Sequence, residues 1–312
     1  MEFVHKPIMA QEVLKLLDPS RGGIFADGTL GGGGHAEAVL EKLPNTGKLY
    51  GIDRDADAIA AASKRLERFN NFQALHGNFF DAKSLFESID VHGIDGLLVD
   101  LGVSSYQLDN PERGFSYKED APLDMRMDES CSFNAYDVVN GYSHGELAKV
   151  IRTYGEEKWA SRIASFIVKE RQTKPICTTY ELVNLIKAAI PASARREGPH
   201  PAKRTFQAIR IEVNHELDGL SKAVEDLVDF LNPNGILAVI TFHSLEDRII
   251  KQTFMRLQNP CTCAASSPIC ICGKKPSVSV LTRKPITPSE EELLDNPRAR
   301  SAKLRAIRKL AL

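Results

Sequence analysis

Three acidic residues each close an apolar segment, and a run of glycines follows the first of them. Asp27, Asp53 and Asp100 end the segments 24–27, 49–53 and 94–100, and glycine fills positions 31–34. Glycine tolerates positive φ and lets a backbone approach a ligand closely. A glycine-rich turn between a strand and a helix is therefore typical of cofactor sites, although glycine runs also occur in plain loops.

These acids are expected at one edge of a parallel sheet. Short apolar segments alternate with segments of helical periodicity, and this alternation predicts parallel βαβ units. The predicted strands cover 24–27, 49–53, 72–75, 94–100 and 235–242, and the predicted helices cover 8–17, 35–43, 55–69 and 223–231, with another opened by Ser244 and Asp247. Because ligands bind beyond the carboxyl ends of such strands, the acids are candidates for ligand contact.

The acids also discriminate between cofactors that contain adenosine. Asp53 follows Gly33 by 20 residues, where a carboxylate can accept hydrogen bonds from both ribose hydroxyls, each contributing roughly 1.5–3 kcal/mol. A nicotinamide dinucleotide would need G-x-G-x-x-G for its pyrophosphate, which residues 28–34 do not supply cleanly. The negative charge of Asp27 suits the sulfonium and amino groups of S-adenosylmethionine. The pattern therefore favours the methyl donor over the dinucleotide.

The middle of the chain has a different pattern. Between 110 and 202 no buried strand is expected, while Ser143 with Glu146 and Thr178 with Glu181 match helix capping boxes. Trp159, Ile163, Phe166 and Ile167 form an apolar stripe that is expected in a core. We predict an α/β domain from 1–109 and 203–312, an all-helical insertion over 110–202, and a strand over 303–309 that pairs with 278–281.

Composition limits the class of protein. Apolar residues make up 43% and charged residues 26% of 312 residues, values typical of soluble globular proteins. The sequence has no apolar run long enough for a membrane span and no apolar leader, so we expect a cytoplasmic protein. The net charge is −1, but 296–312 carries six basic residues and no acidic one. Together with 195–210, this segment is either a solvated face or a surface for a polyanion.

Four of the six cysteines cluster near the C-terminus. Cys261, Cys263, Cys270 and Cys272 could bind zinc, because four thiolates form a tetrahedral zinc site. The C-x-C spacing differs from the usual C-x-x-C, so free thiols and a disulfide remain open as alternatives. Cys131 and Cys177 are isolated and are expected to be inert.

Several longer motifs resemble one family along almost the whole chain. They are DGTLGGGGH (27–35), DRD (53–55), DLGVSSYQLD (100–109), ERGFS (112–116), PLDMRMD (122–128), TFQAIRI (205–211), FHSLEDR (242–248) and NPRARS (296–301). Together they resemble the bacterial 16S ribosomal RNA cytosine-1402 N4-methyltransferases. The resemblance implies a class I methyltransferase Rossmann-like sheet with an inserted helical domain.

The resemblance also implies which residues contact S-adenosylmethionine. They are Gly33, Gly34, His35, Asp53, Phe79, Asp100 and Gln107, to which the glycine turn and the charge argument add Gly31 and Asp27. Phe80 is adjacent to Phe79, and either ring could cover the adenine.

The chemistry of an exocyclic amine indicates further roles. Cytosine N4 is a poor nucleophile until an acceptor draws on its protons, and Asp100, Ser104 or a backbone carbonyl of that loop is our candidate acceptor. Asp100 could instead only hold the methionine part of the donor. His243 could take up the released proton or simply cap the following helix.

The substrate is expected to be 16S rRNA or the small ribosomal subunit, and a homodimer is left open. Arg113 and Arg126 are predicted to contact RNA near the pocket, and Lys203, Arg204, Arg298 and Arg300 to contact phosphates further out. Two other functions remain open, a DNA amino-methyltransferase and a ribosome assembly factor that binds the donor without turnover.

Overall fold

The computed structural model describes residues 7–196, 198–264 and 269–311, and the chain forms two compact units. The first combines the chain up to Gly102 with the chain from Gly219, and the second is Val103–Asp218. The predicted boundaries, 109/110 and 202/203, differ from these. Helix α10 (Lys203–Asn214) packs against α7 (His144–Gly155), so the structure groups 203–218 with the second unit, whereas the sequence prediction places these residues in the α/β domain.

The first unit is built on a seven-stranded sheet in the order β3-β2-β1-β4-β5-β7-β6. The strands are β1 (Ile24–Asp27), β2 (Lys48–Asp53), β3 (Phe72–His76), β4 (Ile94–Asp100), β5 (Leu231–Thr241), β6 (Val278–Val280) and β7 (Lys303–Lys309). β1 to β5 pair in parallel, and β7 is antiparallel to both β5 and β6. The predicted pairing of 303–309 with 278–281 is therefore confirmed, as is the expected class I methyltransferase fold.

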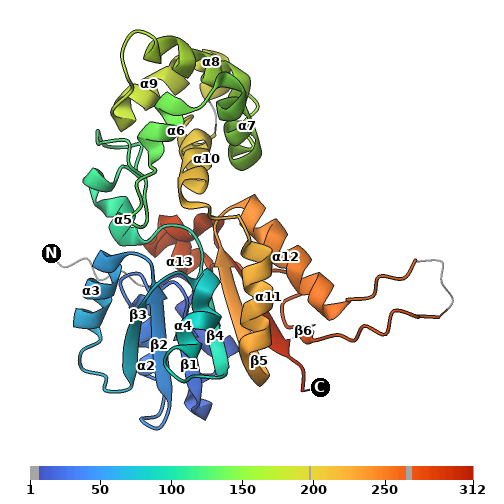
Figure 1. The fold of residues 1–312 in the computed structure, drawn as a ribbon. Helices are drawn as coiled ribbons and strands as arrows, with labels where there is room; N and C mark the ends of the chain where they lie inside the picture. Colours follow the sequence, from blue (N-terminus) through green and yellow to red (C-terminus); the bar gives the residue numbers. More distant parts are fainter. Residues whose placement is uncertain (1–6, 197, 265–268, 312) are drawn as a thin grey trace. The chain divides into compact units, whose positions relative to one another are not determined.

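Helices cover both faces of this sheet (Figure 1). They are α1 (Ala10–Leu17), α2 (Gly34–Leu40), α3 (Ala56–Arg65), α4 (Ala82–Glu87), α11 (Leu220–Phe230), α12 (Ser244–Gln258) and α13 (Glu290–Asp295). Short 3₁₀ turns lie at η1 (Pro19–Arg21), η2 (Phe79–Asp81) and η5 (Pro297–Ser301).

Successive strand residues serve opposite faces, as strand geometry requires. Leu49 joins the apolar cluster formed with α1, α2 and α3, whereas Tyr50 packs edge-on against Phe86 of α4. Phe86 in turn stacks on Phe230 of α11 with ring centroids 5.3 Å apart. Apolar layers therefore pack on both faces of the sheet.

The second unit consists of helices around a core of its own. Its elements are α5 (Ser105–Asp109), η3 (Pro111–Arg113), α6 (Ala135–Gly141), α7, α8 (Ala160–Arg171), α9 (Thr179–Ala189), η4 (Ala192–Arg195) and α10. The capping boxes predicted at Ser143 and Thr178 are both formed. Ile163 and Ile167 are fully buried in the core, and Trp159 and Phe166 pack against it, as the apolar stripe predicts.

No helix among the described residues is both long and apolar enough to cross a membrane.

Candidate active site

The three acids lie at one edge of the sheet. Asp27, Asp53 and Asp100 are the last residues of β1, β2 and β4, and β1 pairs with both other strands. Because the three strands run in parallel, their carboxyl ends meet at the same edge. The sequence prediction that these side chains gather at one edge is confirmed.

The glycine turn crosses the end of β1 and is fixed by main-chain bonds to both neighbouring strands. Gly28 N–H donates to the carbonyl of Leu98 at 2.8 Å, and Leu30 N–H donates to that of Ile52 at 2.9 Å. Gly33 has φ of +77°, and a Cβ there would lie 3.2 Å from the Cβ of Ala62. Glycine at position 33 therefore satisfies both the turn and the close packing of α3.

Asp53 binds the glycine turn directly. Its carboxylate accepts one hydrogen bond from Gly31 N–H at 2.7 Å and another from Asp55 N–H at 2.9 Å. Burial raises the pKa of Asp53, and these two amides partly oppose that effect. Each carboxylate oxygen keeps a second acceptor position, so the group can still accept hydrogen bonds from a diol.

Thr29 links the other two acids, and nothing in the sequence pattern assigned it a role. Its backbone N–H donates to Asp27 Oδ1 at 3.1 Å, and its hydroxyl oxygen accepts from the Asp100 N–H at 2.6 Å. Its position directly after the Asp27-Gly28 pair was the available clue, because Ser and Thr hydroxyls often bind nearby backbone groups in turns.

Asp27 and Asp100 are held where ionisation is costly. The pKa of Asp27 is raised to about 7, chiefly by burial and in smaller part by the charge of Asp53, while hydrogen bonds from Thr29 oppose both. The pKa of Asp100 is raised well above its usual range, first by burial and then by the charges of Asp27 and Glu246. A cation bound between these groups would relieve the repulsion and favour both carboxylates.

His35 lies beside these acids in the first turn of α2. Burial lowers its pKa to about 4, so the imidazole is neutral at physiological pH. Its Nε2 lies 3.7 Å from Asp100 Oδ2. Among the described residues, neither His35 Nε2 nor Asp100 Oδ1 has a hydrogen-bond partner, although both atoms are buried. Buried polar atoms are nearly always paired in proteins, so these two atoms indicate a polar ligand.

Of the two adjacent aromatic rings, Phe79 is the one beside the glycine turn. A Cβ on Gly28 would lie 3.2 Å from the Cβ of Phe79. Phe80 meets Phe79 edge-on with ring centroids 4.7 Å apart. Phe79 therefore lies next to Gly28, the residue that follows β1. This proximity favours Phe79 over Phe80 as the ring that covers a bound base.

His243 is the N-cap of α12. Its Nδ1 accepts from Glu246 N–H at 3.4 Å, and its Nε2 lies 3.1 Å from Glu246 Oε1. The prediction that Ser244 and Asp247 open this helix was wrong by one residue, because the cap pair is His243 and Glu246. The cap uses Nδ1, while the buried Nε2 has no hydrogen-bond partner among the described residues. The capping role is therefore observed, and uptake of the released proton stays a prediction.

Comparison with known proteins covers almost the whole chain. The model of the MraW methylase family matches residues 2–310. The chain belongs to the MraW methylase family. It is 54% identical over 310 residues to Ribosomal RNA small subunit methyltransferase H from two strains of Clostridium botulinum, Loch Maree / Type A3 and 657 / Type Ba4, covering 99% of this chain and 100% of each relative.

A solved rRNA methylase from Streptococcus thermophilus is 11% identical, with a TM-score of 0.40 over 97% of this chain and 94% of that chain. Because this similarity is low, the fold is assigned from the strand order of the sheet described above.

In the second unit, Ser104 and Gln107 form a capping box on α5. Ser104 Oγ accepts from Gln107 N–H at 3.2 Å, and Gln107 Oε1 accepts from Ser104 N–H at 3.1 Å. The two side chains hold the start of α5, and the Ser104 hydroxyl proton is not used by the cap. Their roles in catalysis and donor binding remain predictions.

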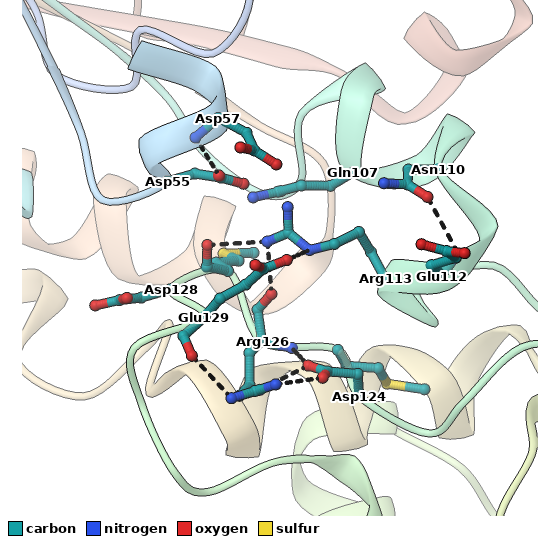
Figure 2. A network of polar contacts seen from close by, with 12 residues as sticks. Asp55, Asp57, Gln107, Asn110, Glu112, Arg113, Asp124, Arg126, Asp128 and Glu129 are labelled. Carbon is teal, nitrogen blue, oxygen red and sulfur yellow. Dashed lines mark hydrogen bonds and ion pairs between the residues drawn. The ribbon is translucent and has the colours of Figure 1, made fainter. Parts of the chain in front are cut away.

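Arg113 and Arg126 hold the segment that follows α5 (Figure 2). Arg126 binds both carboxylate oxygens of Asp124, at 2.8 and 2.6 Å, and donates to the carbonyls of Glu129 and Cys131. Arg113 Nη2 donates to the carbonyls of Arg126 and Met127, and its Nε lies 2.9 Å from Glu129 Oε1. These contacts give both guanidinium groups a structural role, and their contact with RNA stays a prediction.

Asn214 completes this network, and the sequence analysis did not select it. Its Oδ1 accepts from Met127 N–H at 2.7 Å, and its Nδ2 donates to the carbonyls of Met125 and Arg210 at 2.7 and 2.9 Å. The buried amide ties the segment around Met125 to α10. Its place at the end of an apolar helical stripe was the only clue in the sequence.

The remaining basic candidates are exposed. Lys203 and Arg204 lie at the start of α10, and Arg298 and Arg300 lie in η5 of the first unit. Arg204 also donates to the carbonyl of Glu156 at 3.2 Å. Exposed cations of this kind can meet phosphates, and their contact with RNA stays a prediction.

Proposed function

We propose that this protein transfers a methyl group from S-adenosylmethionine to the exocyclic N4 of cytidine 1402 in 16S ribosomal RNA. The full-length match to the MraW methylase family carries this proposal. The name of the 54% identical relatives supports a substrate in the RNA of the small ribosomal subunit. The acids at the sheet edge have raised pKa values, which supports a cationic donor.

The sheet edge offers a partner for each part of S-adenosylmethionine. Asp53 would bind the ribose hydroxyls and Phe79 would cover the adenine. Asp27 and Asp100 would face the amino and sulfonium groups, and the turn from Gly31 through Gly34 to His35 would line the same side. The unpartnered atoms of His35 and Asp100 fit a polar ligand in this position. Gln107 is proposed to complete the donor contacts.

Transfer requires that the target nitrogen become nucleophilic. The N4 lone pair is delocalised into the cytosine ring, so an acceptor must draw on an N4 proton as the nitrogen attacks. The new nitrogen–carbon bond forms while the sulfur–carbon bond breaks, the sulfonium becomes a neutral thioether, and N4 loses a proton. Orienting the two reactants in line can supply roughly 7–11 kcal/mol of the barrier.

Asp100 is our proposed acceptor, with Ser104 as the second candidate in the same loop. In the free protein the raised pKa of Asp100 favours the protonated acid. The positive charge of the donor lowers that pKa, so donor binding would produce the carboxylate that the reaction needs. Asp100 could instead hold only the methionine part of the donor. In that case a substitution at Asp100 would weaken donor binding and leave the rate of the transfer step unchanged.

The helical unit is proposed to recognise the substrate. A base inside a helix must leave its stack to reach a pocket at a sheet edge. Lys203, Arg204, Arg298 and Arg300 would neutralise phosphates of that RNA, whereas Arg113 and Arg126 would act by holding the segment between α5 and α6. Free 16S rRNA and the assembled small subunit are both open as the physiological form, as is a homodimeric enzyme.

One experiment separates this function from its alternatives. The protein would be incubated with S-adenosylmethionine labelled in the methyl group and with naked 16S rRNA, small subunits from cells that lack the protein, or DNA. We expect label in rRNA or subunits and none in DNA. Label in DNA would indicate a DNA methyltransferase. Donor binding without label in any substrate would indicate an assembly factor.

We also propose that the cysteine cluster binds zinc as a structural metal, and this proposal does not depend on the methyl-transfer function.

A further inference from the structure

Four cysteine sulfurs converge on the arm that joins α12 to β6 and extends away from the sheet (Figure 1). Cys270 Sγ lies 3.5 Å from the sulfurs of both Cys261 and Cys272, and 3.9 Å from that of Cys263. The sulfurs of Cys272 and Cys261 are 3.8 Å apart. All four cysteines are free rather than disulfide-bonded.

These separations match the edges of a tetrahedron of metal ligands. A zinc ion bound to four thiolates at about 2.3 Å places neighbouring sulfurs about 3.8 Å apart. A disulfide would instead bring two sulfurs to about 2.05 Å. We infer that Cys261, Cys263, Cys270 and Cys272 bind one zinc ion as a closed, tetrahedral, structural site. Binding releases thiol protons to solvent and changes no oxidation state.

The arm has little else to fix its conformation. Within the described parts of the arm, 260–264 and 269–276, no residue belongs to a helix or strand or makes a backbone–backbone hydrogen bond. Ile269 and Ile271 are 73% and 86% exposed, so they form no apolar core. Segments of this kind obtain their folding free energy from a bound metal.

The backbone also supports a thiolate at this position. Ile271 N–H donates to Cys263 Sγ at 3.4 Å. Hydrogen bonds to a ligand sulfur orient it and stabilise its charged form, as in other metal sites. The two C-x-C pairs thus supply both the ligands and part of their hydrogen bonding, although their spacing departs from the common zinc knuckle.

The test is the metal content of the full chain purified without chelators. We expect about one zinc per chain by plasma mass spectrometry, and X-ray absorption that reports four sulfur neighbours at about 2.3 Å. The paired substitution Cys261→Ser and Cys272→Ser should reduce zinc at least tenfold. The matched control, Cys131→Ser with Cys177→Ser, removes two exposed cysteines outside the cluster and should retain it.

A second measurement uses the wild-type protein, so it does not depend on folding of a variant. Removing zinc with a chelator should speed trypsin cleavage after Lys274, and added zinc should restore protection. Three results would overturn the proposal: zinc-free wild-type protein with six reactive thiols, a protein mass lowered by disulfide formation in the cluster, or full zinc content in the Cys261→Ser, Cys272→Ser protein. Failure here leaves the methyl-transfer proposal intact, because no donor contact lies on this arm.

Discussion

The carboxyl edge of the sheet and the segment between α5 and α6 both concentrate charged side chains, but the charges are paired differently. At the edge, burial raises the pKa of both Asp27 and Asp100, and the charge of Asp27 raises that of Asp100 further. Buried atoms of Asp100 and His35 have no hydrogen-bond partner among the described residues. In the α5–α6 segment, Arg126 satisfies Asp124 and two carbonyls, and Arg113 satisfies two more carbonyls.

This difference separates residues that await a ligand from residues that hold the fold. Charged groups with unfavourable pKa values are stable only because the surrounding structure enforces them, and such groups concentrate at functional sites. Charged groups that bind opposite charges and buried carbonyls, as Arg113 and Arg126 do, are retained because their loss would leave buried partners unpaired. Asp100 and Arg126 both stand in motifs that resemble the same family, and only their contacts distinguish the two roles.

The largest expected effect is on transfer itself. Asp100→Asn keeps the size of the side chain but removes the proton acceptor, so the single-turnover rate should fall about 10²–10⁴-fold. Donor affinity, measured by calorimetry, should change only a few-fold. Asp81→Asn, at an exposed acid in the same unit, serves as the control. A normal transfer rate in Asp100→Asn would restrict Asp100 to donor binding.

Substitution of a paired arginine in the segment between α5 and α6 should lower the stability of the protein. Arg113→Met leaves the carbonyls of Arg126 and Met127 and the carboxylate of Glu129 without their donor, which should cost about 2–4 kcal/mol of unfolding free energy. Chemical denaturation would measure this loss, with the exposed Lys203→Met as the control. Unchanged stability together with weakened RNA binding would contradict the structural role and support Arg113 as an RNA contact.

The affinity for S-adenosylmethionine at the carboxyl edge of the sheet should depend on pH. The pKa of Asp27 is raised to about 7 in the free protein, and a bound cation favours the ionised form, so binding below pH 7 must expel a proton. Asp27 alone should therefore lower the affinity for S-adenosylmethionine about tenfold from pH 8 to pH 6, and proton release from Asp100 should add to this fall. The fall should be smaller for S-adenosylhomocysteine, which lacks the sulfonium charge, and smaller still in Asp27→Asn. Identical pH profiles for the two ligands would contradict the assignment.

The exposed cations should produce the smallest effect. Reversing charge at Arg298 and Arg300 should weaken RNA binding moderately and reduce the slope of log affinity against log salt by about 2. Lys42→Glu, an exposed substitution elsewhere in the first unit, should leave the slope unchanged. An unaltered slope in the Arg298, Arg300 variant would count against phosphate contact there.

Periodicity and motif spacing predicted most of the sheet and the position of three acids at its carboxyl edge. The placement of Asp27, Asp53 and Asp100 follows from short-range rules, because each closes an apolar strand. The boundary at α10 was missed because its helical pattern is equally compatible with either unit, and only its packing on α7 decides. The roles of Arg113, Arg126 and Asn214 depend on contacts between distant segments, which no local pattern contains.

The most direct test of the central claim is mass spectrometry of nucleosides from 16S rRNA after reaction with trideuteromethyl S-adenosylmethionine. Small subunits from cells that lack this protein provide the substrate, and the Asp100→Asn protein provides the matched control. We expect trideuteromethyl label on N4 of cytidine 1402 with the wild-type protein and greatly reduced label with Asp100→Asn. Label at cytosine C5, at another nucleotide, or at equal rates with both proteins would contradict it.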